Sequence, residues 1–362
     1  MISYFKEVVK RHKKKIIFIG IVVGGAVLGS RYAQRRLIEW QEKETKEFLE
    51  RTRKQHYFES TEKTCNQTII FLSSTLREKI SNCVNCDEIL NKLRQGASNK
   101  VELWEELKVL VFTKVSLLIY CGTLLVIALR IQLNIIGGHI YVKTLVQGSD
   151  NKISSELQEE YLSQSNYFLN SGVENLYPLV REKVSLTLKD VTLKQNLTLQ
   201  HVENIFWAIQ SAINDDPRNP IKVMSQLFYG SDFEEQDIFI KDMISDTIDL
   251  LQSSEVMDLA SSCISRGFSY VIDRLSEFFL PEENNIISEF PTTSDKSTST
   301  VRFAHPNSLS KPFAKIIPLI NGFGNPRATS ELPEQWISPF IYMDRVKMLG
   351  ANVYESYSCP VN

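Results

Sequence analysis

Glycine and proline are scarce in this sequence, and so are the residue patterns that enzymes use. Of 362 residues, 15 are glycine and 12 are proline. Few stretches alternate apolar with polar residues, which disfavours a β-rich fold and favours long helices. The sequence holds no phosphate loop, no GxGxxG, no GxSxG and no HExxH. We therefore expect an all-α protein that is not an enzyme and takes no small-molecule substrate.

The chain also lacks an excess of charge of one sign, because its 41 Lys and Arg residues nearly balance its 43 Asp and Glu residues. Proteins that bind nucleic acid usually carry a strong basic excess, so nucleic acid is not an expected partner. Hydrophobic residues make up 43% of the chain and charged residues 23%, as in folded rather than disordered proteins. The length suits one large or two ordinary domains.

Clusters of metal ligands are missing as well. The five histidines include no pair at ligand spacing, and Cys83 and Cys86 form a lone CxxC without a second pair. The six cysteines are scattered, which indicates free thiols in a reducing compartment. We expect no metal and no cofactor. The cysteines are at positions 65, 83, 86, 121, 263 and 359.

The amino terminus combines a basic segment, residues 1–15, with an uncharged stretch, residues 16–30. At 1.5 Å per residue this stretch reaches about 22 Å, and Lys15 and Arg31 can snorkel to extend it toward the roughly 30 Å hydrocarbon core. Arginines stand where a signal peptidase would need small residues. The sequence therefore predicts an uncleaved transmembrane anchor over residues 16–34.

Other features of this region concern targeting and helix pairing. Gly20 and Gly24 make a GxxxG spacing that permits close helix packing in a bilayer. The basic residues serve anchoring at lipid headgroups, targeting to an organelle, or both. The positive-inside rule alone would keep the amino terminus in the cytosol. The basic residues in question are Lys10, Arg11, Lys13, Lys14 and Lys15.

Residues 35–54 predict a highly charged helical stalk with a thin apolar line formed by Leu37, Trp40 and Phe48. Residues 55–362 are expected to form a helical domain. Within it, residues 281–311 are rich in Ser, Thr, Pro and Asn and predict a flexible loop. Helices are expected over residues 62–81, 87–94 and 155–212, with a break at 214–220, followed by a long pair and a last helix near the carboxyl end.

A second hydrophobic stretch, residues 115–129, also lacks charge. Hydropathy alone does not separate a second membrane span from a helix buried on all sides. A span would make the protein a two-span membrane scaffold. The stretch continues an amphipathic helix and lacks a clustered basic flank, so we interpret it as a core helix that ends at Gly137 and Gly138.

The amphipathic helix before it, "SNKVELWEELKVLVF", raises a question about its tryptophan. Leu103, Leu107 and Leu110 fall on one stripe, and Trp104 lies at the edge of that stripe beside Lys108. Trp104 either closes the edge of an ordinary core or serves as an anchor for a partner, a role in which tryptophan is enriched.

Several segments together resemble the peroxin-3 family. They are "KRHKKKIIFIG", "SNKVELWEELK", "RIQLNIIGGHIY", "SRGFSYVIDRLSEFF", "FAKIIPLING" and "ANVYES", and they occur in order from residue 10 to residue 356. The resemblance implies an elongated bundle of long helices with an amino-terminal transmembrane anchor helix. It also implies a location in the peroxisomal membrane, with most of the chain in the cytosol and the short basic terminus in the peroxisome lumen.

The resemblance implies a function as well, that of docking receptor for the chaperone peroxin-19, which brings newly made peroxisomal membrane proteins. The amphipathic amino-terminal helix of peroxin-19 would bind in a hydrophobic groove. Trp104 and Leu107 match the groove wall, and Asn134 matches a motif beside it. Lys315 would meet an acidic residue of the peptide. The complete set of matching positions is Leu93, Lys100, Trp104, Leu107, Asn134, Pro312 and Lys315.

Overall fold

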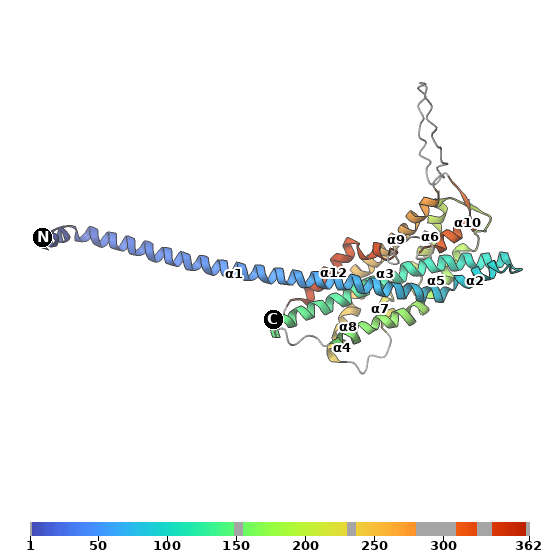
Figure 1. Cartoon of the computed structure of the whole chain (residues 1–362), viewed down its shortest axis with the longest axis horizontal. Coiled ribbons are helices and arrows are strands. Elements are labelled where there is room, and N and C mark those ends of the chain that lie inside the picture. Colours follow the sequence, from blue (N-terminus) through green and yellow to red (C-terminus); the bar gives the residue numbers. More distant parts are fainter. Residues whose placement is uncertain (1, 148–154, 230–236, 280–308, 324–334, 360–362) are drawn as a thin grey trace, which may run out of the picture. The chain divides into compact units, whose positions relative to one another are not determined.

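The structure is a computed structural model, and it describes residues 2–147, 155–229, 237–279, 309–323 and 335–359. Side chains are described from residue 34 onward within these ranges, apart from residues 146–147, 155 and 164. The predicted loop 281–311 therefore lies almost entirely outside the described residues. Figure 1 shows the course of the chain.

Helices account for nearly all of the described elements, which confirms the all-α prediction. The helices are α1 (Ile2–Val84), α2 (Cys86–Arg94), α3 (Lys100–Gln147), α4 (Ser155–Tyr167), the π-helix η1 (Phe168–Gly172), α5 (Val173–Leu188), α6 (Leu199–Asn214), α7 (Met224–Phe228), α8 (Ile238–Leu251), α9 (Ser254–Ser276), the 3-10 helix η2 (Glu277–Phe279), α10 (Phe313–Asn321), α11 (Ser338–Ile341) and α12 (Asp344–Tyr357). Two short strands, β1 (Asn196–Leu197) and β2 (Lys311–Pro312), pair antiparallel.

The chain divides into two compact units, Met1–Glu59 and Ser60–Asn362. The first unit consists of the amino-terminal part of α1, and its backbone is helical through the predicted anchor at 16–34. The side chains proposed for anchoring and targeting, Lys10 to Lys15 together with Gly20 and Gly24, lie outside the described side chains. The transmembrane anchor therefore stays a prediction.

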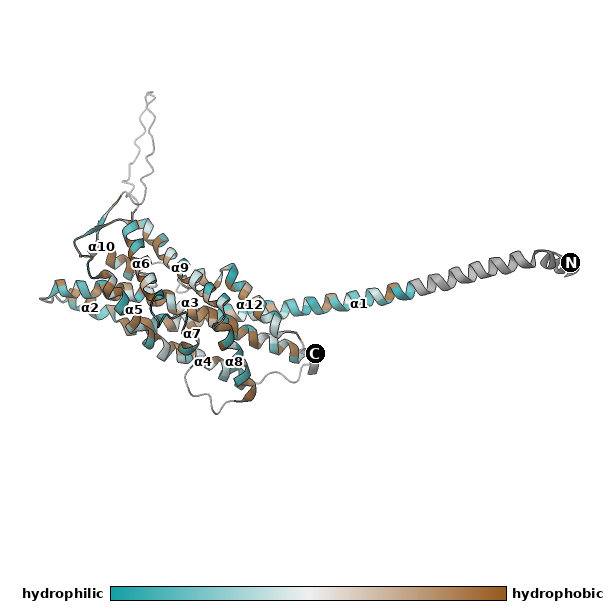
Figure 2. Cartoon of the chain, turned by 180° about the vertical axis from the view of Figure 1, so that it is seen from behind, coloured by the Kyte–Doolittle hydropathy of each residue, from teal (hydrophilic) through white to brown (hydrophobic). Residues whose placement is uncertain are grey.

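The second unit is a helical bundle built around α3. Every residue from 111 to 138 is buried, so this helix has no solvent-facing side over seven turns. Figure 2 shows this apolar stretch of α3 within the bundle. Among the described residues, Lys100–Leu145 is the one helix long and apolar enough to cross a membrane, and its most hydrophobic window is completely buried.

Other helices cover α3 along its length. Phe313 of α10 contacts the ring of Phe112, with 5.8 Å between the ring centroids, and Phe268 of α9 lies 6.1 Å from Tyr120. The outer faces of these helices are charged, as at Asp258 and Arg266 of α9. Charged outer faces do not suit a lipid environment. The burial therefore favours a core helix over a second membrane span at 115–129.

The predicted end of this helix at Gly137 and Gly138 is wrong, because α3 continues to Gln147. The two glycines allow close packing instead of breaking the helix. A Cβ at Gly137 would lie 2.6 Å from the side chain of Thr61, and one at Gly138 would lie 2.7 Å from Tyr357. Glycine at these positions therefore lets α1 and α12 approach α3 closely.

A buried polar junction joins α3 to α1 and to the end of α11, about two turns before these glycines. The fully buried guanidinium of Arg130 pairs with Glu62 at 2.6 Å and donates hydrogen bonds to Asn66 Oδ1 at 2.8 Å and to the Ile341 carbonyl at 3.2 Å. Gly350 of α12 lies against it, where a Cβ would come within 2.9 Å of the arginine stem. Arginine suits this place because its planar group makes several directed bonds at once.

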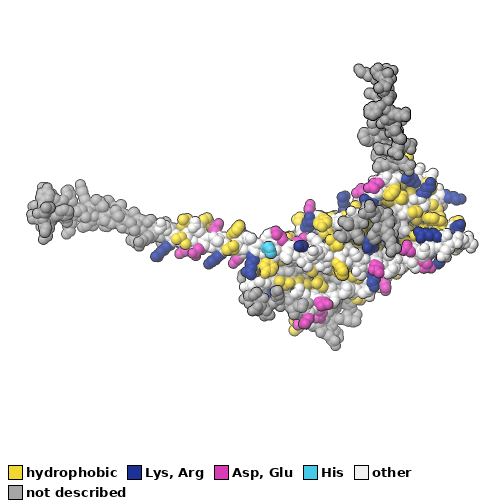
Figure 3. Space-filling model, viewed as in Figure 1, with side chains coloured by type: hydrophobic (Ala, Val, Ile, Leu, Met, Phe, Trp, Pro, Cys, Tyr) yellow, Lys and Arg dark blue, Asp and Glu magenta, His cyan; other side chains and the backbone are white. Residues whose placement is uncertain are grey.

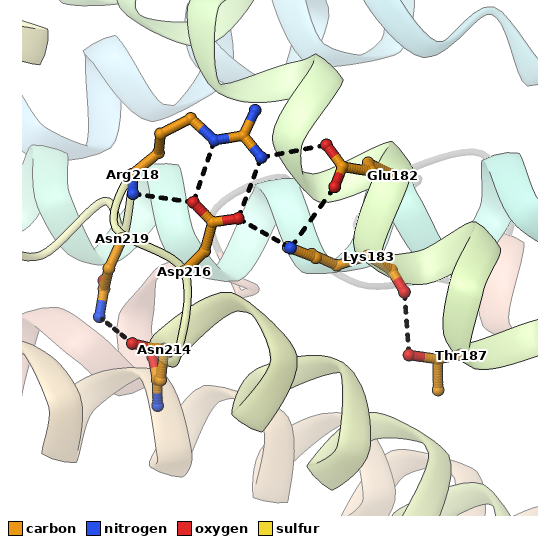
Figure 4. Close-up of polar contacts among 7 residues, drawn as sticks. All are labelled: Glu182, Lys183, Thr187, Asn214, Asp216, Arg218 and Asn219. Atoms are coloured by element: carbon orange, nitrogen blue, oxygen red, sulfur yellow. Dashed lines mark hydrogen bonds and ion pairs between the residues drawn. The ribbon is translucent and has the colours of Figure 1, made fainter.

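The predicted break at 214–220 is present, and an ion-pair cluster holds it to α5 (Figure 4). Asp216 accepts hydrogen bonds from the backbone, Nε and Nη2 of Arg218 and pairs with Lys183 Nζ at 2.7 Å. Glu182 pairs with Arg218 at 3.0 Å and with Lys183 at 3.5 Å. Two carboxylates and two cationic side chains thus pair with one another, which is typical of a structural ion-pair network.

Candidate functional site

The predicted site begins at the turn between α2 and α3. Gly96 has φ +81°, a left-handed conformation that glycine adopts without strain, and its amide donates to the Leu93 carbonyl. Leu93 is half-buried against the core, and Lys100, the first residue of α3, is exposed. The turn therefore places these two predicted residues beside the first turns of α3.

Trp104 lies one turn into α3 and is half-buried, packed against the core but not sealed within it. Val101, one turn earlier on the same side of the helix, is 72% exposed. Leu107 is buried in the core and lies beneath the surface. An indole at such a boundary keeps part of its apolar area available for a partner.

Lys108 is a residue of this region that we did not predict. Its ammonium group is buried, and it donates hydrogen bonds to the carbonyls of Leu188 at 3.2 Å and Val191 at 2.9 Å and pairs with Glu105. A cation at these carbonyls satisfies the carboxyl end of α5. Its position one turn after Trp104, between glutamates and a valine-leucine run, was the only signal in the sequence.

Pro312 and Lys315 come from the opposite end of the chain. The amides of Phe313 and Ala314 donate to the carbonyls of Gln195 at 2.9 Å and Leu193 at 3.2 Å. This pairing holds the start of α10 against the loop that Lys108 fixes. The buried ring of Phe313 then contacts Phe112 of α3.

Phe112 lies eight residues after Trp104, about 12 Å along the helix. Pro312 is half-buried and Lys315 is exposed. Six of the seven predicted residues thus belong to elements at one end of the bundle, where Figure 1 shows α2 and α10. Figure 3 shows hydrophobic side chains with Lys and Arg among them at this end.

The seventh residue, Asn134, does not belong to this site. It lies thirty residues after Trp104 on the same continuous helix, which separates them by about 45 Å. It is completely buried, and its Nδ2 donates to the Arg130 carbonyl at 2.8 Å. Asn134 is therefore part of the polar junction described above and lies apart from the other six residues.

The described residues offer little for catalysis. Burial raises the pKa of the Cys86 thiol to about 11 and those of Cys65 and Cys263 to about 12, so these thiols stay protonated and unreactive. No group of three or more His, Cys, Asp or Glu side chains in the described part of the chain could hold a metal ion. The arrangement is suited to binding by apolar contact.

Comparison with known proteins gives the family. A family model described as Peroxin-3 matches residues 7–100, 96–155 and 146–356. Peroxisomal biogenesis factor 3 of Mus musculus is 33% identical over 375 residues, covering 97% of this chain and 96% of that protein. The Homo sapiens protein of the same name is 33% identical over 371 residues with the same coverage. The Yarrowia lipolytica protein is 21% identical over 355 residues, covering 75% of this chain and 82% of its own.

These matches extend over nearly the whole chain. Residue patterns that occur in order from the basic amino terminus to the last helix are thus part of one continuous similarity. The chain belongs to the peroxin-3 family of peroxisome biogenesis factors, which are not enzymes, and it has a role in peroxisome biogenesis.

Proposed function

We propose that this protein is the docking receptor for peroxin-19 at the peroxisomal membrane, where it receives newly made membrane proteins for insertion. The anchor at 16–34 holds it in the membrane, and the helical domain faces the cytosol. The observation that supports this proposal is the half-buried Trp104 beside the exposed Val101 at one end of the bundle.

The ligand is the amphipathic amino-terminal helix of peroxin-19. Its apolar side chains pack on Trp104, Val101 and Leu93, and burial of this area supplies most of the affinity. A partly exposed tryptophan already ordered by the core loses little conformational freedom on binding, which makes it an efficient anchor.

Charge contributes less. Lys100 and Lys315 are both exposed at this end, and each is placed to meet an acidic side chain of the bound helix. An exposed ion pair of this kind is worth under about 1 kcal/mol, so the lysines orient the ligand more than they hold it.

The test is calorimetry of a fragment that begins at Glu42 with a labelled peptide of the peroxin-19 amino-terminal helix. Trp104→Ala is expected to weaken binding by about 2–4 kcal/mol, as truncation of a central aromatic anchor does. The matched control is Phe71→Ala, because Phe71 is 72% exposed on α1, a helix that contacts the middle of α3 where Cys65 meets Leu129.

Unchanged affinity of a correctly folded Trp104→Ala variant would remove this residue from the site. The same preparation tests the alternative function of a two-span scaffold. A fragment without residues 1–41 should be soluble without detergent if 115–129 is a core helix, and insoluble if it is a membrane span.

A further inference from the structure

The charged stalk has one face without any charge. Between residues 34 and 56 there are twelve Asp, Glu, Lys and Arg residues, more than half of the segment. At 100° per residue, all twelve fall outside an arc of about 120°. The ten residues inside this arc, named here the uncharged face, are Gln34, Leu37, Ile38, Gln41, Thr45, Phe48, Leu49, Thr52, Gln55 and His56.

The centre of the uncharged face has the spacing of a coiled coil. Its residues alternate steps of four and three, an average of 3.5 residues, which is the period of a left-handed helix pair. Leu37 and Leu49 flank this line. The seven residues of the line, named here the seam, are Gln34, Ile38, Gln41, Thr45, Phe48, Thr52 and Gln55.

Nothing within the described part of Met1–Glu59 covers this face. Leu37, Ile38, Phe48 and Leu49 are 53–68% exposed. On the charged side, in contrast, Glu47 pairs along the helix with Lys43 at 3.9 Å and with Arg51 at 3.7 Å. Figure 3 shows hydrophobic side chains in the open on this part of α1. Four large apolar side chains left exposed on a face without charge indicate a partner helix.

A membrane surface is a poor match for this face. Helices that lie on anionic membranes carry a strong excess of Lys and Arg on the polar side. Residues 35–54 carry seven basic and five acidic residues, and the two signs are mixed along the helix. A seam with a 3.5-residue period instead fits a second helix of the same period, and the same chain supplies one with identical register.

We propose that the uncharged face pairs with the same face of a second copy of this chain, in parallel. The parallel direction follows from the predicted anchor, which places the stalks of both copies on the same side of one membrane. Glutamine and threonine occupy five of the seven seam positions, so the pair is weak and its register is specified by polar contacts. Confinement of both anchors to one membrane supplies the effective concentration that such a weak pair needs.

Disulfide cross-linking of the full chain in lipid vesicles tests this pairing. Cys83 and Cys359, the described cysteines that are not buried, are first replaced by serine. Single cysteines are then introduced in the seam by Ile38→Cys, Gln41→Cys, Thr45→Cys and Phe48→Cys. The controls on the charged side are Glu39→Cys, Lys43→Cys and Lys46→Cys, and copper phenanthroline is the oxidant.

Covalent dimer is expected at all four seam positions, with at least about fivefold higher yield than at the controls, because only seam residues approach their own counterparts. Equal yields on both sides, or no dimer, would overturn the proposal. Dimer at Thr45 alone would show antiparallel pairing and would overturn it as well.

A matched pair of charge substitutions gives a second readout. Phe48→Glu places two carboxylates in the seam and should lower the dimer yield of Gln41→Cys by about fivefold or more. Trp40→Glu makes the same change at an exposed aromatic residue outside the seam and should leave the yield unchanged. Equal effects of both substitutions would contradict the assigned face.

Discussion

The two ends of α3 differ in how far their side chains are exposed to solvent. At the amino end Trp104 is half-buried, and Val101 and Lys100 face the solvent. Toward the carboxyl end Arg130 and Asn134 are completely buried. Arg130 bonds to Glu62 and Asn66 of α1 and to the Ile341 carbonyl of α11, and Asn134 donates to the Arg130 carbonyl of α3 itself. Both stretches carried the resemblance to the peroxin-3 family.

This difference in exposure distinguishes two roles for residues that carry the family resemblance. A polar residue whose bonds are made inside the chain maintains the fold, as Arg130 does for the junction of α1, α3 and α11. An apolar residue whose area is left partly open is available for a partner, as Trp104 is. The pattern around "LNIIGG" therefore belongs to the fold, and we propose that the pattern around "LWEEL" serves docking.

The largest expected effect on stability is at Arg130, in the buried carboxyl half of α3. Arg130→Ala leaves Glu62 without its cation and opens a cavity, so the free energy of unfolding should fall by about 3–5 kcal/mol. Urea denaturation of the Glu42 fragment, followed by circular dichroism, measures this loss. The control is Arg181→Ala, since Arg181 is about half-exposed and faces Glu106 at 4.0 Å, and it should cost under about 1 kcal/mol. Equal costs would contradict the structural assignment of Arg130.

For the glycines of "LNIIGG", the sign of the change in stability on substitution by alanine tests the structure. Gly138→Ala should destabilise the fragment by about 1–3 kcal/mol, because a Cβ would lie 2.7 Å from the Tyr357 backbone of α12. A glycine with open surroundings would behave in the opposite way, since alanine favours a helix by about 1 kcal/mol. Stabilisation in urea denaturation would therefore refute the close approach of α12 to α3.

The smallest effect is expected at the ion-pair cluster around Asp216. Hydrogen bonds from the side chains of Arg218 and Lys183 hold the pKa of this carboxyl far below its usual range. The stability that it contributes is present above its unfolded pKa, about 3.9, and is lost as the pH falls below that value. Asp216→Asn should thus make the fragment's unfolding less sensitive to pH between about 4 and 2. The exposed Asp258→Asn is the control, and equal pH profiles of the two variants would show that the cluster adds nothing.

Much of the fold follows from sequence patterns. Scarce turn residues and apolar runs at helical spacing predicted the all-α bundle, and the uncharged stretch 115–129 predicted the buried centre of α3. The continuation of α3 through Gly137 and Gly138 was not predictable, because a glycine pair reads as a helix end unless its neighbours are known. Only the positions of Thr61 and Tyr357 reveal that these glycines serve packing.

The proximity of the candidate site residues was predictable where these residues are close together in the sequence. Leu93, Lys100 and Trp104 lie within about three helical turns of one another, so their proximity follows from local structure. The distance of Asn134 from these residues was not predictable, because resemblance gives no separation along a continuous helix. Lys108 was missed because a lysine beside glutamates reads as solvent-exposed, and only the carbonyls of Leu188 and Val191 explain its burial.

Hydrogen exchange of the Glu42 fragment, with and without the peroxin-19 peptide, tests the docking assignment most directly. Backbone amides protected by the bound helix should lie in residues 90–108 and 311–318, at the amino end of α3 and the start of α10. Amides of residues 128–140 should exchange at the same rate in both samples. Protection confined to residues 128–140, with none around Trp104, would contradict the proposal that peroxin-19 docks at the amino end of α3.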